Sequence, residues 1–238
     1  MADEVKKENP LIWAEGLTKT FQVGERTVEA LRGLDLEIKE KDFIVIFGPS
    51  GCGKSTLLNV LVGLEKPSSG MCLIKDKNIY TLASDDIGKL RADIFGIIYQ
   101  KSYWVSSLTV LENIALPLII NGIGENEARE RAKELLESLK IGDLAYHKPF
   151  HLSGGEQQKV ACARALITDP EVIIADEPTG NLDTSSADSL IGVIESLNRG
   201  WGKTVILVTH NPAYREIGTR QIEMRDGKII KEKEQSWV

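Results

Sequence analysis

The sequence predicts an α/β protein with a mostly parallel sheet covered by helices, a smaller antiparallel β layer and an inserted helical segment. Short apolar runs alternate with longer helical patterns, which is typical of a parallel sheet buried on both faces. The first forty residues and the tail instead contain short strand-like runs separated by turn residues, which is typical of antiparallel pairing. We find no internal repeat and no linker, so we expect one folding unit.

Composition excludes several classes of protein. The chain has 238 residues, of which 42% are hydrophobic and 27% charged, so neither a disordered nor a fibrous protein is expected. Its 35 acidic and 29 basic residues leave a net charge of −6, which disfavours duplex DNA or RNA as the main partner. The three cysteines form no CxxC pair, which argues against a disulfide scaffold or zinc module and indicates a reducing compartment.

No targeting or membrane segment is expected. The N-terminal residues are polar and mixed in charge, unlike a secretory signal. The longest apolar run, Ile114–Ile120, contains a proline and is far shorter than the roughly 18 residues of a membrane span. We therefore expect a soluble intracellular protein.

Apolar runs give the expected strands and one clear helix. The parallel sheet is expected to contain Phe43–Phe47, Phe95–Tyr99, Val172–Ala175 and Thr204–Val208. Between the second and third of these runs, Glu125–Lys140 carries alanines and leucines along a single stripe, which predicts an amphipathic helix. The antiparallel parts are expected at Leu11–Ala14, Val28–Leu31 and Leu34–Ile38, at Met71–Lys75 with Asp76–Asn78, and at Gln221–Arg225 with Lys228–Lys231.

A phosphate-binding loop follows the first of the parallel strands. The pattern G-x-x-x-x-G-K-[ST] is filled by Gly48, Pro49, Ser50, Gly51, Cys52, Gly53, Lys54 and Ser55. Glycines let backbone N–H groups turn toward a polyphosphate, and the start of the following helix, from Thr56, adds partial positive charge. Lys54 supplies a charge for the β and γ phosphates, and the Ser55 hydroxyl is placed to ligate Mg²⁺. This motif predicts a nucleoside triphosphate site.

Two further strands end in residues that suit the same site. Val172–Ala175 is followed by Asp176, which can hold Mg²⁺, and by Glu177, which can act as general base or orient the attacking water. Thr204–Val208 is followed by Thr209 and His210, and this histidine could donate to a γ-phosphate or to that water. Alone, the acids could be an exposed strand end and the histidine a structural residue.

A second anion-binding helix start is predicted near the middle of the chain. Ser153 and Glu156 form an S-x-x-E capping box, which by itself predicts only a well-capped helix. Gly154 and Gly155, inside the box, lower helix propensity and expose backbone N–H groups, which capping does not require. Exposed amides, a helix start and a hydroxyl together suit a phosphate, and one chain with two such ends suggests that the second serves another molecule's nucleotide.

In this order the motifs resemble those of the nucleotide-binding subunit of an ATP-binding cassette (ABC) transporter, from about Leu11 to Ile230. The resemblance implies a P-loop NTPase (RecA-like) core with an antiparallel β subdomain and a helical subdomain at about 86–160. The single domain would span 11–232, between tails at 1–10 and 233–238. It also implies a second copy of the chain packed head to tail, with ATP and Mg²⁺ between the copies. Each ATP would contact Lys54 and its loop in one copy and Ser153, Gly154 and Gly155 in the other.

The resemblance gives further residues a role. Phe21 matches the aromatic that stacks on adenine, Gln100 the glutamine that touches Mg²⁺ and the attacking water, and His210 the switch histidine. Asp183 matches the D-loop, and Thr56 is grouped with the ATP-binding residues. From the residues alone, Phe21 could be a core aromatic and Gln100 a surface residue. Glu156 stands where the family usually has glutamine and Phe21 where it has tyrosine, but glutamate still completes the capping box and phenylalanine still stacks.

A finer resemblance is to the macrolide-export and lipoprotein-release branch, which includes the FtsE type. It is carried by Lys54–Leu64, Leu108–Pro117 and Ala175–Asp183. The branch implies a motor that pulls on a membrane partner. Tyr103 and Trp104, where relatives have a different segment, are either anchors for that partner or aromatic core of the helical insert.

Three classes of function remain to be compared. We expect an ATP-hydrolysing motor subunit for a separate integral membrane permease, of an export or lipoprotein-extrusion type, at the cytoplasmic face of the cell membrane. The alternative is a soluble ABC ATPase acting on DNA or ribosomes, but the stretch between Lys54 and Ser153 has no sustained heptads and the chain has one cassette, so no nucleic acid is expected. A P-loop kinase or GTPase would not explain the LSGGE stretch.

Overall fold

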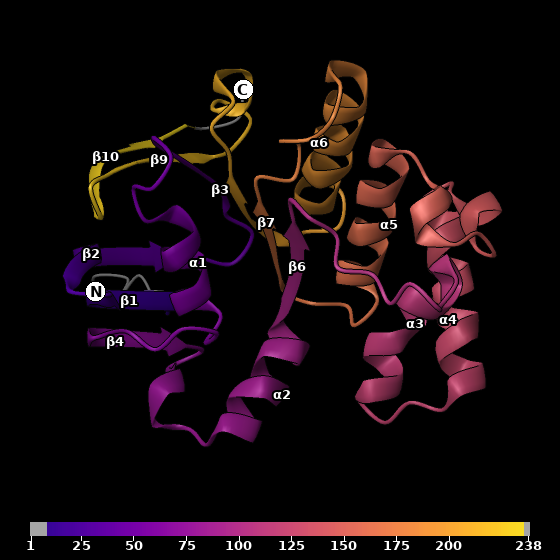
Figure 1. Cartoon of the computed structure of the whole chain (residues 1–238), viewed down its shortest axis with the longest axis horizontal. Helices are drawn as coiled ribbons and strands as arrows, with labels where there is room; N and C mark the ends of the chain where they lie inside the picture. The colour runs from indigo at the N-terminus through magenta and orange to yellow at the C-terminus, as the bar shows by residue number, and fades with distance from the viewer. Residues whose placement is uncertain (1–8, 236–238) are drawn as a thin grey trace, which may run out of the picture.

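The computed structural model describes residues 9–235, so parts of both expected tails, 1–8 and 236–238, lie outside the described residues. The core is a six-stranded sheet (Figure 1) made of β3 (Phe43–Phe47), β6 (Phe95–Tyr99), β7 (Val172–Asp176), β8 (Thr204–Val208), β9 (Arg220–Arg225) and β10 (Lys228–Glu234). The order is β10-β9-β3-β8-β7-β6, and every pair is parallel except β9 with β10. The predicted parallel sheet is therefore confirmed.

The central strands of the core sheet, β3, β8 and β7, are buried on both faces because they are apolar along nearly all of their length. In β3, Ile44 and Ile46 pack in one hydrophobic cluster with Leu57 of α1 (Lys54–Leu61). The alternate residues Phe43 and Val45 pack in a second cluster, with α5 (Gly154–Leu166) and α6 (Thr184–Arg199). The sheet therefore separates α1 from α5 and α6, and Figure 1 shows α1 and α5 on opposite sides of it.

A second, four-stranded sheet lies beside α1. Its order is β2-β1-β4-β5, all antiparallel, from β1 (Ile12–Val23), β2 (Arg26–Ile38), β4 (Ser69–Ile74) and β5 (Lys77–Asn78). The short strands expected at 11–14, 28–31 and 34–38 are wrong in length, because the chain forms two strands of 12 and 13 residues. Register shifts, one of them between Ala14 and Leu17, interrupt the alternation of buried and exposed residues. Those interruptions make two long strands look like several pieces.

Both predicted hairpins are confirmed. β4 turns into β5 through Lys75 and Asp76, and β9 turns into β10 through Asp226 and Gly227. All four turn residues have positive φ, the backbone conformation of tight hairpin turns. The second hairpin closes against the phosphate loop, since Gly227 N–H donates to the Cys52 carbonyl at 2.9 Å.

The helical stretch expected at about 86–160 is not continuous. α2 (Ser84–Ile94) leads directly into β6, an edge strand of the core sheet, and the remaining helices α3 (Val110–Ile120) and α4 (Glu125–Ser138) come after it. The correction has a physical reason: every residue of β6 pairs with β7, so this strand belongs to the core. α3 and α4 share a third hydrophobic cluster with one side of α5.

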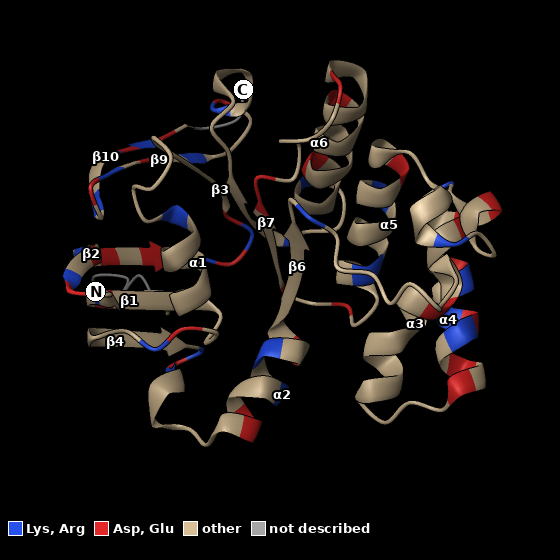
Figure 2. Cartoon of the chain, viewed as in Figure 1, with Lys and Arg blue, Asp and Glu red and all other residues tan. Residues whose placement is uncertain are grey.

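The helix expected at 125–140 is confirmed as α4 and ends at Ser138, because Lys140 turns the chain with a positive φ of 58°. Figure 2 shows both signs of charge along α4, where Arg129–Glu125 and Arg131–Glu127 ion pairs join successive turns. Among residues 9–235, no helix combines the length and hydrophobicity needed to cross a bilayer.

Candidate nucleotide site

The phosphate loop joins β3 to α1, as its pattern predicts. Gly53 caps α1 with a positive φ of 105°, and a Cβ there would lie 2.4 Å from the Ala30 carbonyl oxygen. Only glycine therefore fits at that position. The Cys52 side chain is buried in the core, and its sulfur accepts from the Lys54 ammonium at 3.9 Å.

Lys54 already lies inside the loop. Its side chain is buried, and its ammonium donates to the carbonyls of Gly48 at 2.8 Å and Pro49 at 3.0 Å. The positive charge is thereby held at the centre of the turn. The cavity beside it has a volume of about 320 Å³ and is lined by Val28, Glu29, Ala30, Ser50, Gly51, Gly53, Lys54, Ser55, Thr56 and Glu177.

Asp176, at the end of β7, has the features of a magnesium ligand. Burial raises the pKa of its carboxyl, a hydrogen bond from Ser55 lowers it, and the neighbouring Glu177 charge raises it. Its Oδ1 is buried and has no hydrogen-bond partner in the described part of the chain. A hard cation prefers such oxygens, and Mg²⁺ commonly takes only one or two protein ligands beside substrate phosphates. Ser55 and Asp176 therefore fit this ion, although residues 9–235 contain no larger cluster of metal-ligating side chains.

Glu177 and His210 meet across the ends of β7 and β8. Glu177 Oε2 lies 2.5 Å from His210 Nδ1 and accepts from the His210 backbone N–H at 3.3 Å. Glu177 has a positive φ of 50°, and its own N–H donates to the Val208 carbonyl at 3.0 Å. A non-glycine residue in this conformation is uncommon and is held there by its surroundings. The carboxylate is thereby fixed at the edge of the cavity.

Gln100 follows β6 and reaches the same edge of the sheet. Its Nε2 lies 3.5 Å from Asn181 Oδ1, and a Cβ on Gly180 would lie 2.6 Å from that nitrogen. Gln100 is therefore packed beside the segment that follows Glu177. The adjacent parallel strands β6, β7 and β8 thus direct Gln100, Asp176 with Glu177, and His210 to one edge, where open α/β sheets bind ligands.

The capping box expected at the LSGGE stretch is present. Glu156 Oε2 accepts from the Ser153 N–H at 2.8 Å and from its hydroxyl at 2.7 Å, and these bonds lower the pKa of the Glu156 carboxyl. Ser153 and Gly154 are exposed, whereas a Cβ on Gly155 would lie 2.8 Å from Ser186 Oγ. The described residues that line the cavity beside Lys54 include none of Ser153–Glu156. This helix start therefore does not contribute to the cavity beside Lys54.

Two other predicted site residues have different surroundings. Phe21 lies directly across β1 and β2 from Val28, which lines the cavity, and Lys19 Nζ lies 4.9 Å from the Phe21 ring centre. Phe21 is therefore the strand neighbour of a residue in the cavity wall. Asp183 caps α6 by accepting from the Ser186 N–H at 3.0 Å, which lowers the pKa of its carboxyl. The structure gives Asp183 this capping contact and does not bring it to the cavity.

Sequence reasoning missed several neighbours of the site. Val28 and Glu29 line the cavity only because β1 and β2 pair in this register, and Asn181 meets Gln100 only through the packing of β6 beside β7. No local pattern marks these residues. The two aromatic residues of the insert differ in their surroundings. Trp104 is partly buried and packs into the core, whereas Tyr103 is 71% exposed.

The phosphate loop, the paired acids and the second helix start agree with the result of a comparison with known protein families. Residues 31–180 match the ABC transporter family, and the chain belongs to that family. It is an ABC ATPase cassette with the P-loop NTPase fold, and ATP with Mg²⁺ is what such cassettes bind. The resemblance seen in the motifs is thus confirmed.

Particular relatives define the branch. The chain is 43% identical over 221 residues to the macrolide export ATP-binding/permease protein MacB of Hyphomonas neptunium, covering 93% of this chain and 34% of that one. It spans about a third of the length of the MacB relatives it matches. It is 42% identical over 226 residues to the uncharacterized ABC transporter ATP-binding protein MJ0796 of Methanocaldococcus jannaschii, covering 93% and 96% of the two chains.

Solved structures agree with this assignment. The dimeric structure of the MJ0796 cassette superposes with a TM-score of 0.87 at 39% identity, covering 95% of this chain and all of the other. A second dimeric MJ0796 structure, a post-hydrolysis state bound to ADP and Pi, gives the same TM-score at 38% identity and covers the same shares of the two chains. These are structures of a relative, and what they imply for this chain is argued next.

Proposed function

We propose that this chain is the ATP-hydrolysing motor subunit of a transport complex, in which two copies close around two ATP molecules and drive a separate membrane permease. One observation carries the proposal: the chain has a phosphate loop with its acids and, on the far side of the sheet, an exposed anion-binding helix start at Ser153 that this cavity does not use. A head-to-tail dimer gives that helix start a phosphate. The dimeric MJ0796 structures support this reading.

Within one copy, different residues bind the phosphates, the adenine and Mg²⁺. Lys54 and the loop amides hold the β and γ phosphates, and the Phe21 ring stacks on the adenine. Ser55 and Asp176 would hold Mg²⁺, which when bound offsets the negative charge of the phosphates. Thr56 completes the loop at the start of α1. Ser153, Gly154 and Gly155 of the other copy then approach the same γ-phosphate.

Hydrolysis is assigned to the edge where three strands end. Glu177 orients the attacking water and takes its proton as the water oxygen bonds to the γ-phosphorus. The bond from that phosphorus to the β–γ bridging oxygen breaks, and the electron pair leaves with ADP. His210 holds the Glu177 carboxylate in place through the 2.5 Å contact, and Gln100 helps to position the water.

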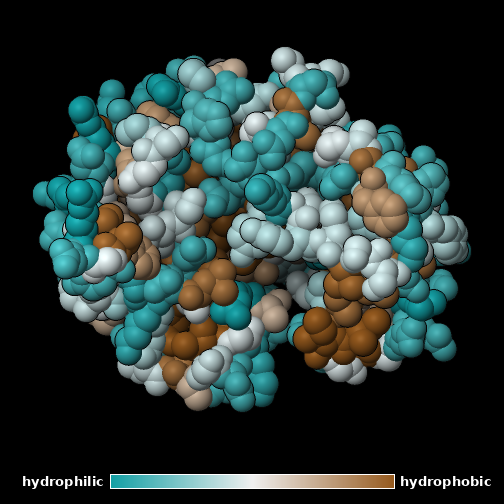
Figure 3. Space-filling model, viewed as in Figure 1, coloured by the Kyte–Doolittle hydropathy of each residue, from teal (hydrophilic) through white to brown (hydrophobic). Residues whose placement is uncertain are grey.

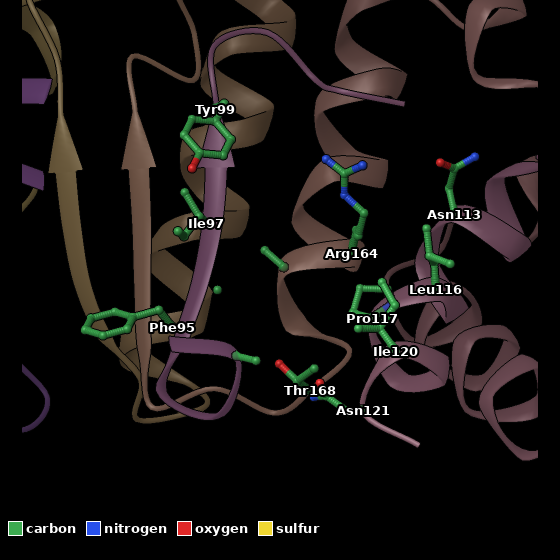
Figure 4. Close-up of a pocket in the computed structure, with 13 residues that line it drawn as sticks. Phe95, Ile97, Tyr99, Asn113, Leu116, Pro117, Ile120, Asn121, Arg164 and Thr168 are labelled. Atoms are coloured by element: carbon green, nitrogen blue, oxygen red, sulfur yellow. The ribbon is translucent and has the colours of Figure 1, made fainter. Parts of the chain in front are cut away.

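A groove beside β6 suits the membrane partner. It has a volume of about 410 Å³ (Figure 4), and Tyr99, directly before Gln100, is one of its walls. On the other wall, α3 presents Ile120, which is 75% exposed, and Figure 3 shows a hydrophobic patch over this helix. An apolar helix in the groove would contact β6, the strand that leads into Gln100. The groove is lined by Ala92, Phe95, Gly96, Ile97, Tyr99, Asn113, Leu116, Pro117, Ile120, Asn121, Arg164, Ala165 and Thr168.

The partner we propose is an integral membrane permease, which would hold the cassette on the inner face of the cell membrane. MacB relatives carry ATP-binding and permease parts in one protein, and this chain matches about a third of their length. Tyr103, beside the groove-lining Tyr99, is the aromatic anchor for that partner. Export and lipoprotein or peptide extrusion are the two transport types that this branch supports.

The test is capture of the partner from membranes. Tagged Glu177→Gln protein with ATP is incubated with detergent-solubilised membranes, and co-purifying proteins are identified, with Lys54→Ala as the matched variant that cannot hold ATP. A membrane protein that is retained by Glu177→Gln and lost with Lys54→Ala supports the proposal. Ribosomal or DNA-associated proteins without a membrane protein contradict it and favour a soluble ATPase.

A further inference from the structure

Trp104 connects the loop that follows β6 to helix α5. This loop begins at Gln100 and is named the Gln100 loop. The Trp104 indole Nε1–H donates to Gln157 Oε1 at 3.2 Å, and the Arg164 guanidinium lies 4.4 Å from the indole ring centre. Gln157 and Arg164 are about two helical turns apart and therefore lie on the same side of α5. The indole is thus held along one face of that helix by a hydrogen bond and a cation–π contact.

The backbone of the same loop is also held by α5. Gln158 Nε2 donates to the Gln100 carbonyl at 2.9 Å, and Arg164 Nη1 donates to the Tyr103 carbonyl at 2.5 Å. Gln158 is 5% exposed, so its bond is shielded from water and is stronger for it. Side chains of a single helix therefore hold the first part of the loop at two points, Gln100 and Tyr103.

Gln157 continues the chain of contacts to the helix start. Its Nε2 donates to the Leu152 carbonyl at 3.1 Å, while its Oε1 accepts from Trp104. Leu152 directly precedes Ser153, the capping residue of α5. One glutamine side chain thus connects the indole in the Gln100 loop to the peptide that leads into the exposed helix start.

We propose that Trp104 is a positioning residue that makes the Gln100 loop and the Ser153 helix start move as one body. The inference rests on the function proposed above, in which Gln100 serves the ATP of its own copy and Ser153 the ATP of the other copy. ATP at one site then favours the arrangement that the second site needs. Two sites that bias one shared arrangement are coupled in free energy.

The test compares two tryptophan substitutions in the purified chain. Trp104→Phe keeps an aromatic ring under Arg164 but is smaller and lacks the indole N–H. Trp201→Phe makes the same change at an exposed tryptophan just after α6 and is the matched control. We expect Trp104→Phe to lower kcat by about 2- to 10-fold, which corresponds to the net contribution of one hydrogen bond. The ATP dependence should change from sigmoidal toward hyperbolic, while ATP affinity of the monomer stays unchanged.

A second variant removes the same hydrogen bond from the other side. Gln157→Leu should reproduce the loss of cooperativity, and the double variant with Trp104→Phe should lose no more than the larger single effect. Gln157→Leu carries the same expectation if Trp104→Phe does not fold. A merely structural role would lower stability and leave the ATP dependence unchanged.

The outcomes separate this inference from the proposed function. If wild type and Trp201→Phe dimerise with ATP and hydrolyse it, and both Trp104→Phe and Gln157→Leu match their kcat and ATP dependence, the coupling role is wrong and the motor function stands. If wild type neither dimerises nor hydrolyses ATP, the function itself fails, and this inference fails with it.

Discussion

Glu177 is the single residue whose conformation says most about the chemistry. It is held at a positive φ of 50° by a backbone bond to Val208 and a side-chain contact with His210. Such backbone strain costs on the order of 1–3 kcal/mol and persists where surrounding structure enforces it. The identity of this acid was predictable because it follows an apolar strand. Its backbone conformation was not, because it depends on the neighbouring strand.

Replacing Glu177 separates hydrolysis from binding. Glu177→Gln keeps the shape of the side chain and removes the proton acceptor, so we expect ATP hydrolysis to fall by about 10²- to 10⁴-fold. ATP binding is expected to remain and a closed dimer to accumulate, which phosphate release and size-exclusion chromatography with ATP would measure. Glu130→Gln, on the exposed side of α4, is the control. Hydrolysis at the wild-type rate would show that Glu177 is not the catalytic base.

The buried carboxyl of Asp176 is expected to oppose stability in the absence of ligand. Its pKa is raised, chiefly by burial, so the folded state binds this proton more tightly than the unfolded state does. The free energy of unfolding therefore falls as pH rises from the ordinary aspartate pKa through the raised one. We expect Asp176→Asn to be more stable than wild type at neutral pH and to lose that part of the pH dependence.

Urea unfolding of both proteins across this pH range would measure the effect, with Asp93→Asn on the exposed side of α2 as control. The same Asp176→Asn variant should lose magnesium-dependent hydrolysis, since a ligand suited to the ion is gone. A variant less stable than wild type at neutral pH would contradict the assignment. Sites that hold charge for a ligand commonly lower the stability of the empty protein.

The helices and strands were predicted unevenly. The buried strands β3, β6 and β8 match their expected limits because a continuous apolar run begins and ends where the strand does. β1 and β2 were expected as short pieces because bulges interrupt their alternation of buried and exposed residues. The helical interval expected at about 86–160 was too wide, since it includes β6, which its own apolar run predicts to be a strand. The limits of β1 and β2 depend on pairing between strands, some of them distant in the chain, and the local sequence contains no signal for that pairing.

Two helix starts in this chain carry the same capping box and allow a matched comparison. Ser153 with Glu156 begins α5, and Thr109 with Glu112 begins α3. Removing either cap hydroxyl, in Ser153→Ala or Thr109→Ala, is expected to lower the free energy of unfolding by about 0.5–2 kcal/mol. Only Ser153→Ala should also weaken ATP-dependent dimerisation, because in the proposed dimer only that helix start, of the two, meets a nucleotide.

Sedimentation velocity with and without ATP would measure the dimer, and chemical denaturation would measure stability. Ser153→Arg should prevent the dimer, because a long cationic side chain fills the space for the phosphate. If Ser153→Ala and Thr109→Ala weaken dimerisation equally, the cap has only a structural role. Dimerisation of Ser153→Arg at the wild-type ATP concentration would contradict the second anion site.

At the scale of the whole molecule, a single strand, β6, connects the groove to the catalytic edge of the sheet. β6 contributes Tyr99 to the groove wall and is followed by Gln100, so an occupant of the groove touches the strand that leads into the site. Ile120→Glu adds a charge to the apolar wall, and we expect it to abolish recovery of the permease from solubilised membranes. Ile230→Glu, at an exposed position on β10, is the matched control. Equal recovery with both variants would exclude this groove as the docking site.

The separation of Lys54 from Ser153 by the core sheet has a genetic consequence. In the proposed dimer each ATP site takes Lys54 from one copy and Ser153 from the other. A chain with Lys54→Ala and a chain with Ser153→Arg are each inactive alone. In a mixed dimer, however, one ATP site combines the intact Lys54 of the second chain with the intact Ser153 of the first. Mixed in one cell, the two defective alleles would restore a single working site, whereas the same two changes on one chain would restore none.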